Sequence, residues 1–199
     1  MPRRYSMARR GEATEETRGR MQTAFSRLLA SKAYGAITMA DIASEADVSV
    51  RTVQRHYRTK DELLAALCGR SVQWISQGVS ERARRRSPRE EIQLLVDLHF
   101  RYYAEHDAEC WALYSRAPEV PEIQQALAIA AQAWMEPFEE VAARWPHVWA
   151  VDRESVQRVV LALTSYPVWR GFTGLARFST AEAAELVTKL LSQELLADR

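Results

Sequence analysis

The feature that most constrains this chain is a repeated signal for the start of an α-helix. A serine or threonine precedes an acidic residue by three positions at Thr38–Asp41, Thr59–Glu62, Ser87–Glu90 and Ser179–Glu182. In such a capping box, the first side chain and the carboxylate satisfy backbone N–H groups that the helix itself leaves free. Glycine and proline number only seven each, and no Asn-Gly or Asp-Gly hairpin turn occurs. The sequence therefore predicts an all-α fold.

Apolar residues at helical spacing, and the breaks between them, predict where the helices begin and end. Pro167 is expected to kink the predicted helix 152–171 near its end. Three of the starts fall within 22 residues, although an average helix is itself about 11 or 12 residues long. The expected helices are 14–31, 38–46, 49–57, 60–85, 87–106, 108–115, 121–144, 152–171 and 179–197.

The stretch from Met39 to Tyr57 has the pattern of a helix-turn-helix. Ile42 and Ala43 are expected to point inward from its first helix, and Val53 to face back from its second. The outward face of the second helix is polar and basic, which suits the major groove of DNA. That face is made of Val50, Arg51, Thr52, Gln54, Arg55 and His56.

The net charge of +1 hides an asymmetry between the two ends of the chain. Residues 1–60 hold 12 lysines and arginines against 6 acidic residues, whereas residues 61–199 hold 15 against 20. A basic segment joined to an acidic body is typical of a nucleic-acid-binding module attached to a domain that does not bind nucleic acid. Chance clustering of arginines in the N-terminal tail is the alternative explanation.

With this helix-turn-helix pattern, the sequence resembles the TetR family of transcriptional regulators. The resemblance runs from Arg18 to Leu67. Two residues depart from the family pattern: Asp47 stands where the turn usually has glycine, and Gln54 stands where an aromatic residue is usual. The matching segments are Thr38-Met-Ala-Asp-Ile-Ala, Ala43-Ser-Glu-Ala-Asp-Val-Ser49, Thr52-Val-Gln-Arg-His-Tyr57 and Lys60-Asp-Glu-Leu-Leu64.

Three regions are expected along the chain. Residues 1–12 form a flexible basic arm, residues 13–60 a helix-turn-helix DNA-binding domain, and residues 61–199 a helical domain for dimerisation and ligand binding. No apolar run reaches the roughly 18 residues that would cross a bilayer, and the polar start lacks the apolar region of a signal peptide. We therefore expect a cytoplasmic protein with reduced cysteines and no membrane partner.

Roles in DNA binding follow from the resemblance and from the chemistry of each side chain. Arginine can read guanine with two hydrogen bonds, but half or more of protein–DNA hydrogen bonds go to the backbone, so Arg51 and Arg55 could instead clamp phosphates. The residues expected to contact bases are Val50, Arg51, Thr52, Gln54 and Arg55. The residues expected to contact phosphates are Thr38, Ser49, His56 and Lys60.

The last two predicted helices carry apolar stripes that suit a dimer interface, and the resemblance implies that they pair with their symmetry mates. Burial inside the monomer must account for part of each stripe. A dimer also follows from the mechanism, because two recognition helices read half-sites about 34 Å apart. The candidates are Val156, Val159, Val160, Leu163, Leu186, Val187, Leu190 and Leu191.

Aromatic residues are concentrated after residue 73, where they could line a pocket for an apolar or aromatic ligand or simply fill the core. Arg101, Arg116 and Glu136 could set the charge of such a ligand. His99 and His106 are spaced seven residues apart, which does not suit a metal site, so no metal is expected. The pocket candidates are Trp74, Tyr103, Trp111, Tyr114, Trp134, Phe138 and Trp169.

Taken together, these patterns predict a dimeric repressor that a small ligand releases from an inverted-repeat operator in double-stranded DNA. A DNA-binding regulator without a small-molecule effector is the nearest alternative. An enzyme is not expected, because no GxSxG, HExxH, CxxC or P-loop pattern occurs. No cofactor is expected. A helical interaction protein that does not bind DNA remains a third alternative.

Overall fold

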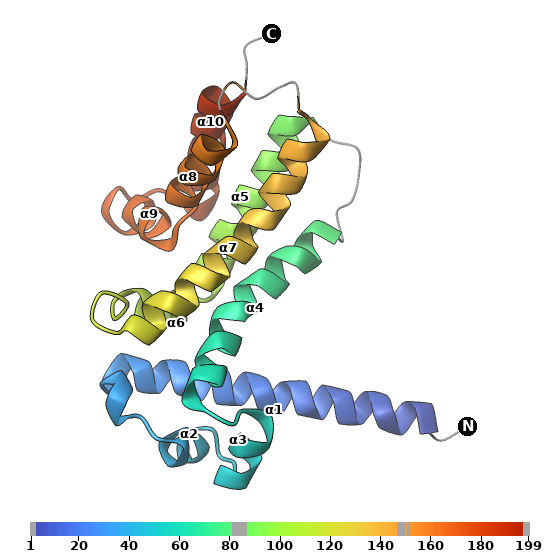
Figure 1. Cartoon of the computed structure of the whole chain (residues 1–199), viewed down its shortest axis with the longest axis vertical. Coiled ribbons are helices and arrows are strands. Elements are labelled where there is room, and N and C mark those ends of the chain that lie inside the picture. Colours follow the sequence, from blue (N-terminus) through green and yellow to red (C-terminus); the bar gives the residue numbers. More distant parts are fainter. Residues whose placement is uncertain (1–2, 81–86, 147–149, 151, 197–199) are drawn as a thin grey trace. The chain divides into compact units, whose positions relative to one another are not determined.

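The computed structural model describes residues 3–80, 87–146, 150 and 152–196, and within these ranges it consists of helices joined by short turns, with no strand (Figure 1). This confirms the all-α prediction. Among these residues, no helix has the length and apolar character needed to cross a membrane. The chain divides into two compact units, which are Met1–Leu67 with Trp111–Ala126, and Cys68–Cys110 with Leu127–Arg199.

The first unit is built around a long helix and two short ones. Helix α1 (Arg3–Ser31) leads through a 3-10 turn, η1 (Tyr34–Ala36), to α2 (Met39–Glu45) and α3 (Val50–His56), and the start of α4 (Lys60–Ser80) follows. Helix α2 packs against both α1 and α3. The side chains that fill this core are wholly buried and apolar, namely Met21, Phe25, Leu29, Ile42, Val53 and Leu63.

Helix α1 begins eleven residues earlier than the sequence predicted, at Arg3 instead of position 14. Residues 3–12, which were expected to form a flexible arm, are therefore helical here. Arginine, alanine, methionine and glutamate dominate this segment, and all of them favour the helix, with Gly11 as its single weak point. The flexibility of this arm stays a prediction.

The second unit contains most of the remaining helices. They are α5 (Pro88–Glu105), α6 (Asp107–Tyr114), α7 (Pro121–Arg144), α8 (Arg153–Leu163), α9 (Tyr166–Arg170), the π-helical turn η2 (Gly171–Leu175) and α10 (Thr180–Leu195). The first half of α6 and the later part of α7 belong to this unit. Helices α5 and α10 share its most extensive contact, and α10 also packs on α8.

The segment predicted as one kinked helix, 152–171, is two helices. Helix α8 ends at the C-cap Thr164, Ser165 is the N-cap of α9, and Pro167 lies in the first turn of α9. Proline lacks an N–H group and has a fixed φ, so it fits a first turn but would break the interior of a helix. The break leaves the Thr164 carbonyl available, and the buried Tyr103 hydroxyl donates to it at 3.1 Å.

The capping boxes at Thr38, Ser87 and Ser179 are present as the sequence predicted. At Thr59 the arrangement differs: its hydroxyl accepts from the N–H of Glu62 at 3.1 Å, while the Glu62 carboxylate accepts from the N–H of Arg58 at 2.7 Å. Side chains thus accept hydrogen bonds from two backbone N–H groups at each of these four helix starts.

Candidate nucleic-acid interface

The helix-turn-helix is held together by a small buried core. Ile42 and Val53 are fully buried, and Ala43 is 3% exposed where α2 and α3 meet. The N–H of Val48 donates to the carbonyl of Ala43 at 3.0 Å and closes the turn between the helices. Asp47 occupies the left-handed region at φ 54°, as expected for the residue that replaces the usual glycine.

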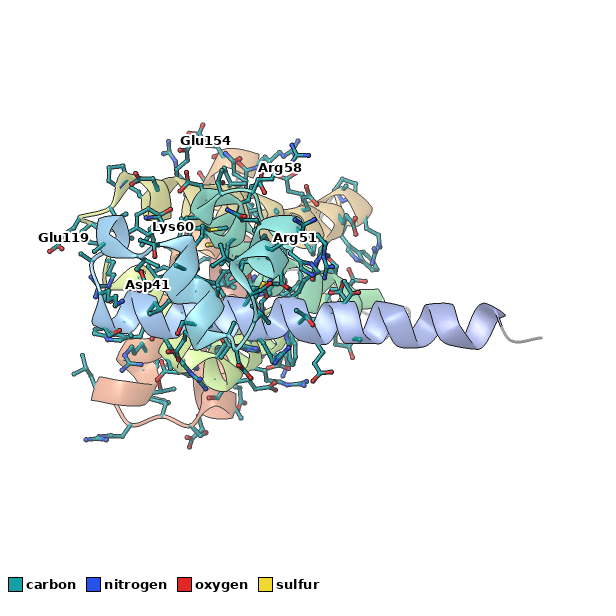
Figure 2. All side chains as sticks on the ribbon, turned by 90° about the horizontal axis from the view of Figure 1, so that it is seen from below. Asp41, Arg51, Arg58, Lys60, Glu119 and Glu154 are labelled. Atoms are coloured by element: carbon teal, nitrogen blue, oxygen red, sulfur yellow. The ribbon has the colours of Figure 1, made fainter. Side chains whose placement is uncertain are left out.

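This core turns one face of α3 to the outside. Arg51, Gln54 and Arg55 are exposed, and Val50 is 39% exposed, so four of the five residues expected to contact bases present their side chains to solvent. Figure 2 labels Arg51 on this face. Thr52 is half-buried, and its hydroxyl shares a 2.8 Å hydrogen bond with that of Ser49.

The hydroxyls of Thr38 and Ser49 cap the helices that follow them. Ser49 accepts from the N–H of Thr52 at 3.1 Å. Thr38 accepts from the N–H of Asp41 at 3.1 Å and donates its own hydroxyl to the Asp41 carboxylate at 2.7 Å. Hydrogen bonds from Lys32 and then from Thr38 hold the pKa of Asp41 well below its usual range. A phosphate that approaches Thr38 would therefore meet a carboxylate that is already paired with the Lys32 ammonium at 2.8 Å.

The Lys60 ammonium binds the chain itself. It donates to the carbonyls of Tyr34 at 2.6 Å and Ile37 at 3.3 Å, and lies 4.0 Å from the centre of the Tyr34 ring. The Tyr34 hydroxyl donates to Asp61, and burial followed by this contact raises the pKa of Tyr34. Lys60 therefore fastens the start of α4 to η1 and keeps only one N–H donor for any further partner.

His56, the last expected phosphate contact, is half-buried at the end of α3. Burial, and then the nearby charges of Arg55 and Arg18, lower its pKa. The neutral imidazole can donate one hydrogen bond but brings no positive charge. Arg18, whose charge acts on His56, and the exposed Arg58 were not predicted from the sequence. Arg58 directly follows the predicted motif, whereas no local pattern indicates Arg18.

In the second unit, four of the predicted pocket residues meet in one aromatic cluster. The ring of Tyr103 lies 5.3 Å from that of Trp134 and 6.0 Å from that of Trp169, measured between centroids. His99 packs edge-on against Trp134 at 4.6 Å and lies 5.7 Å from Phe138. These four aromatic side chains are buried, so they form a core as well as a candidate pocket wall.

The other three predicted pocket residues are placed differently. Trp74 joins the edge of the cluster, since it contacts Tyr102 at 6.1 Å and donates from its indole to the Leu98 carbonyl at 3.2 Å. Trp111 and Tyr114 belong to the first unit, and Trp111 is 51% exposed.

The predicted dimer stripes are divided between core and surface. Val156, Val160, Val187 and Leu191 are buried within the second unit. The other four candidates are half-exposed and lie on the two helices that pack together, α8 and α10. They are Val159, Leu163, Leu186 and Leu190.

Among the described residues, no group of three or more histidine, cysteine or acidic side chains could hold a metal ion. The Nδ1 atoms of His99 and His106 each face a backbone carbonyl one turn earlier, those of Leu95 at 2.6 Å and Tyr102 at 3.0 Å.

Comparison with known proteins gives a consistent result. Residues 24–67 match the family model of bacterial regulatory proteins of the tetR family. A tetR-family regulatory protein from Rhodococcus RHA1 has 21% identity and a TM-score of 0.69, with 92% of this chain and 98% of that chain covered. A search of curated protein sequences finds no match.

Two further solved structures have the same fold. The transcriptional regulator FadR from Bacillus subtilis, in complex with stearoyl-CoA, has 14% identity and a TM-score of 0.73, with 88% of this chain and 97% of that chain covered. A candidate transcriptional regulator from Saccharomonospora viridis, in complex with choline, has 18% identity and a TM-score of 0.62, with 92% and 100% covered. Residues 24–67 are therefore similar to the tetR family of bacterial regulatory proteins, and the chain as a whole has the fold of solved TetR-family transcriptional regulators.

Proposed function

We propose that this protein is a sequence-specific DNA-binding transcriptional regulator that acts as a homodimer on an inverted-repeat operator and is released by a small ligand. The observation that carries the proposal is the face of α3. Arg51, Gln54 and Arg55 are exposed on a helix whose opposite side is anchored by the fully buried Val53. A short rigid helix with hydrogen-bonding and basic side chains is what the major groove admits.

The proposed domain arrangement follows the predicted boundaries. Residues 13–60 bind DNA, residues 61–199 dimerise and bind the ligand, and the basic residues 1–12 act as an arm at the start of α1. One α3 makes few contacts, so tight specific binding needs a second copy. The half-exposed apolar residues of α8 and α10 supply the surface through which two copies pair.

Release by ligand needs a ligand that binds better to the form whose recognition helices are wrongly spaced. The aromatic second unit is the proposed place for it. The similar solved structures contain stearoyl-CoA in one case and choline in another, so the fold alone does not fix the ligand's chemistry.

The decisive experiment is selection of bound sequences from a random pool of duplex DNA with the purified protein. We expect an inverted repeat, and an affinity that falls steeply as salt rises, because phosphate contacts release counterions. Failure to enrich any sequence at low and moderate salt would contradict the proposal. With an enriched site, no loss of DNA affinity with any candidate compound would favour the alternative regulator without a small-molecule effector.

A single substitution tests the assignment of α3. Arg55→Ala should weaken binding to the selected site by about 10- to 100-fold and relax the preference at one base pair of each half-site, because a bidentate arginine–guanine contact contributes roughly 1–3 kcal/mol. Arg89→Ala, which removes an exposed arginine from α5, is the matched control and should leave binding unchanged. A uniform loss over all sequences for Arg55→Ala would assign that residue to a phosphate instead.

A further inference from the structure

The second unit contains a groove between α7 and α8 with a volume of about 640 Å³, in the range of small-molecule sites. Its apolar side is formed by Met135, Phe138, Ala142 and Val156. Glu139 also lines the groove, and it accepts hydrogen bonds at 2.5 Å from both Arg153 and Gln157 on α8.

The groove carries an excess of negative charge. Glu136 and Glu140 lie one turn apart on α7, line the groove and are exposed. Arg153 is the cation on the lining, and it is already paired with Glu139. The charged groups that remain to meet a ligand are therefore carboxylates, which favour a cation and disfavour an anion.

A buried histidine lies directly behind the apolar side of the groove. His99 is 1% exposed, and its ring packs on Phe138, which lines the groove. Its Nδ1 lies 2.6 Å from the Leu95 carbonyl, and a carbonyl can only accept a hydrogen bond, so Nδ1 carries the proton. Burial lowers the pKa of His99 to about 4, so the ring is neutral at neutral pH.

The other ring nitrogen is thus an acceptor that lacks a donor. The Nε2 of His99 is buried and has no hydrogen-bond partner within the part of the chain that the structure describes. An unsatisfied buried acceptor is costly, and a hydroxyl or N–H donor from a bound molecule would satisfy it. His99 therefore favours a ligand with a hydrogen-bond donor, whereas the carboxylates favour a ligand with a positive charge.

We propose that the groove between α7 and α8 binds an aromatic amine that carries a hydroxyl group. The ammonium lies at Glu136 and Glu140, the ring lies against the apolar side, and the hydroxyl donates to Nε2 of His99 after the Phe138 ring turns aside. The claim that this amine releases the protein from DNA rests on the proposed function. The claim that the groove binds the amine does not.

Three small probes of matched shape separate the parts of this proposal. Tyramine carries the ring, the hydroxyl and the ammonium; phenethylamine lacks the hydroxyl; 3-(4-hydroxyphenyl)propanoate replaces the ammonium by a carboxylate. Titration calorimetry with the purified full chain measures each dissociation constant. We expect tyramine to bind at least about tenfold more tightly than either analogue, since one satisfied buried hydrogen bond corresponds to about that factor. Equal affinity for all three, or no binding of tyramine, would overturn the proposal.

Variants assign each preference to its residues. Glu136→Gln with Glu140→Gln should abolish the preference for ammonium over carboxylate and keep the preference for the hydroxyl, whereas His99→Phe should do the reverse. Glu105→Gln, an exposed change on α5, is the matched control and should change neither preference. The proposal is contradicted if the double glutamate variant still prefers ammonium over carboxylate, or if His99→Phe still prefers the ligand with the hydroxyl.

A measurement on the unaltered protein covers the case in which His99→Phe does not fold. In a long-range proton–nitrogen NMR spectrum, tyramine should shift the Nε2 resonance of His99 in the direction of a hydrogen-bonded acceptor, and phenethylamine should not. Movement of that resonance by both probes or by neither would contradict the hydroxyl contact. None of these measurements includes DNA, so amine binding without DNA binding would remove the proposed function alone, and DNA binding without amine binding would remove this inference alone.

Discussion

The two units of this protein differ in how fully their buried polar groups are satisfied. In the first unit, the polar side chains of the core have partners: Gln22 donates to the Tyr57 hydroxyl at 3.0 Å, and Ser26 donates to a backbone carbonyl at 2.9 Å. Among the described residues, the buried side-chain atoms without a hydrogen-bond partner all belong to the second unit. They are Glu91 Oε2, His99 Nε2, Trp145 Nε1, Trp169 Nε1, Thr188 Oγ1 and Ser192 Oγ.

The two units therefore place their polar groups differently, inside the core in one case and on the surface in the other. In the first unit, the buried polar side chains have partners, and the side chains proposed to contact DNA lie outside, on α3. The second unit keeps donors and acceptors inside, where each unsatisfied group costs free energy of unfolding unless another molecule meets it. We therefore expect substitutions in the first core to abolish DNA binding through unfolding, and substitutions in the second to change stability and ligand affinity in opposite directions.

The largest expected effect is in the first core. Ile42→Asp places a carboxylate at a fully buried position between α2 and α3 and should lower the free energy of unfolding by several kcal/mol, with loss of DNA binding. Urea denaturation and DNA titration measure the two effects. Ser44→Asp, an exposed change on the same helix, should alter neither greatly. Normal DNA binding by Ile42→Asp would show that this core does not position α3.

The next effect concerns pH and the second core. Burial lowers the pKa of His99 from 6.5 to about 4, so the unfolded chain takes up a proton between these values while the folded chain does not. Acidification from pH 6.5 to pH 4 should therefore remove about 3 kcal/mol from the free energy of unfolding through this one group. His99→Phe should flatten that part of the pH profile and raise stability at neutral pH, because it removes the unsatisfied acceptor.

The measurement is chemical denaturation of both proteins over this pH range. The difference between the two profiles removes the contribution of His56, which titrates in the same direction and is present in both. Parallel profiles would mean that His99 titrates alike in the folded and unfolded chains, and the contrast between the two interiors would lose its main support.

The smallest expected effect lies in the turn of the helix-turn-helix. Asp47→Gly should raise the free energy of unfolding by less than about 1 kcal/mol, because glycine adopts the positive φ found here without the strain of a side chain. Thermal unfolding measures it, and the exposed Arg177, which has a φ of 63° in the second unit, offers the matched variant Arg177→Gly. A destabilised Asp47→Gly would indicate that the aspartate side chain supports the turn.

The sequence predicted the first unit better than the second, for a physical reason. Caps such as Thr38 and Ser49, and the left-handed Asp47, act over three or four residues, so their partners can be read from neighbouring positions. The contacts of Lys60 with Tyr34 and Ile37 span more than twenty residues, and no local pattern indicates them. The aromatic residues of the second unit could be recognised as a group, but not which of them meet, because that depends on how α5, α7 and α9 pack.

The break between α8 and α9 affects a hydrogen bond with a residue that is distant in the sequence. In an unbroken helix, the carbonyl of Thr164 would accept from the N–H of residue 168, and the phenol of Tyr103, 61 positions earlier in the chain, would have to share that oxygen. Pro167 therefore contributes to anchoring an aromatic ring that it need not touch. A search for related sequences that share this interior should accordingly weigh the proline and the tyrosine as a linked pair.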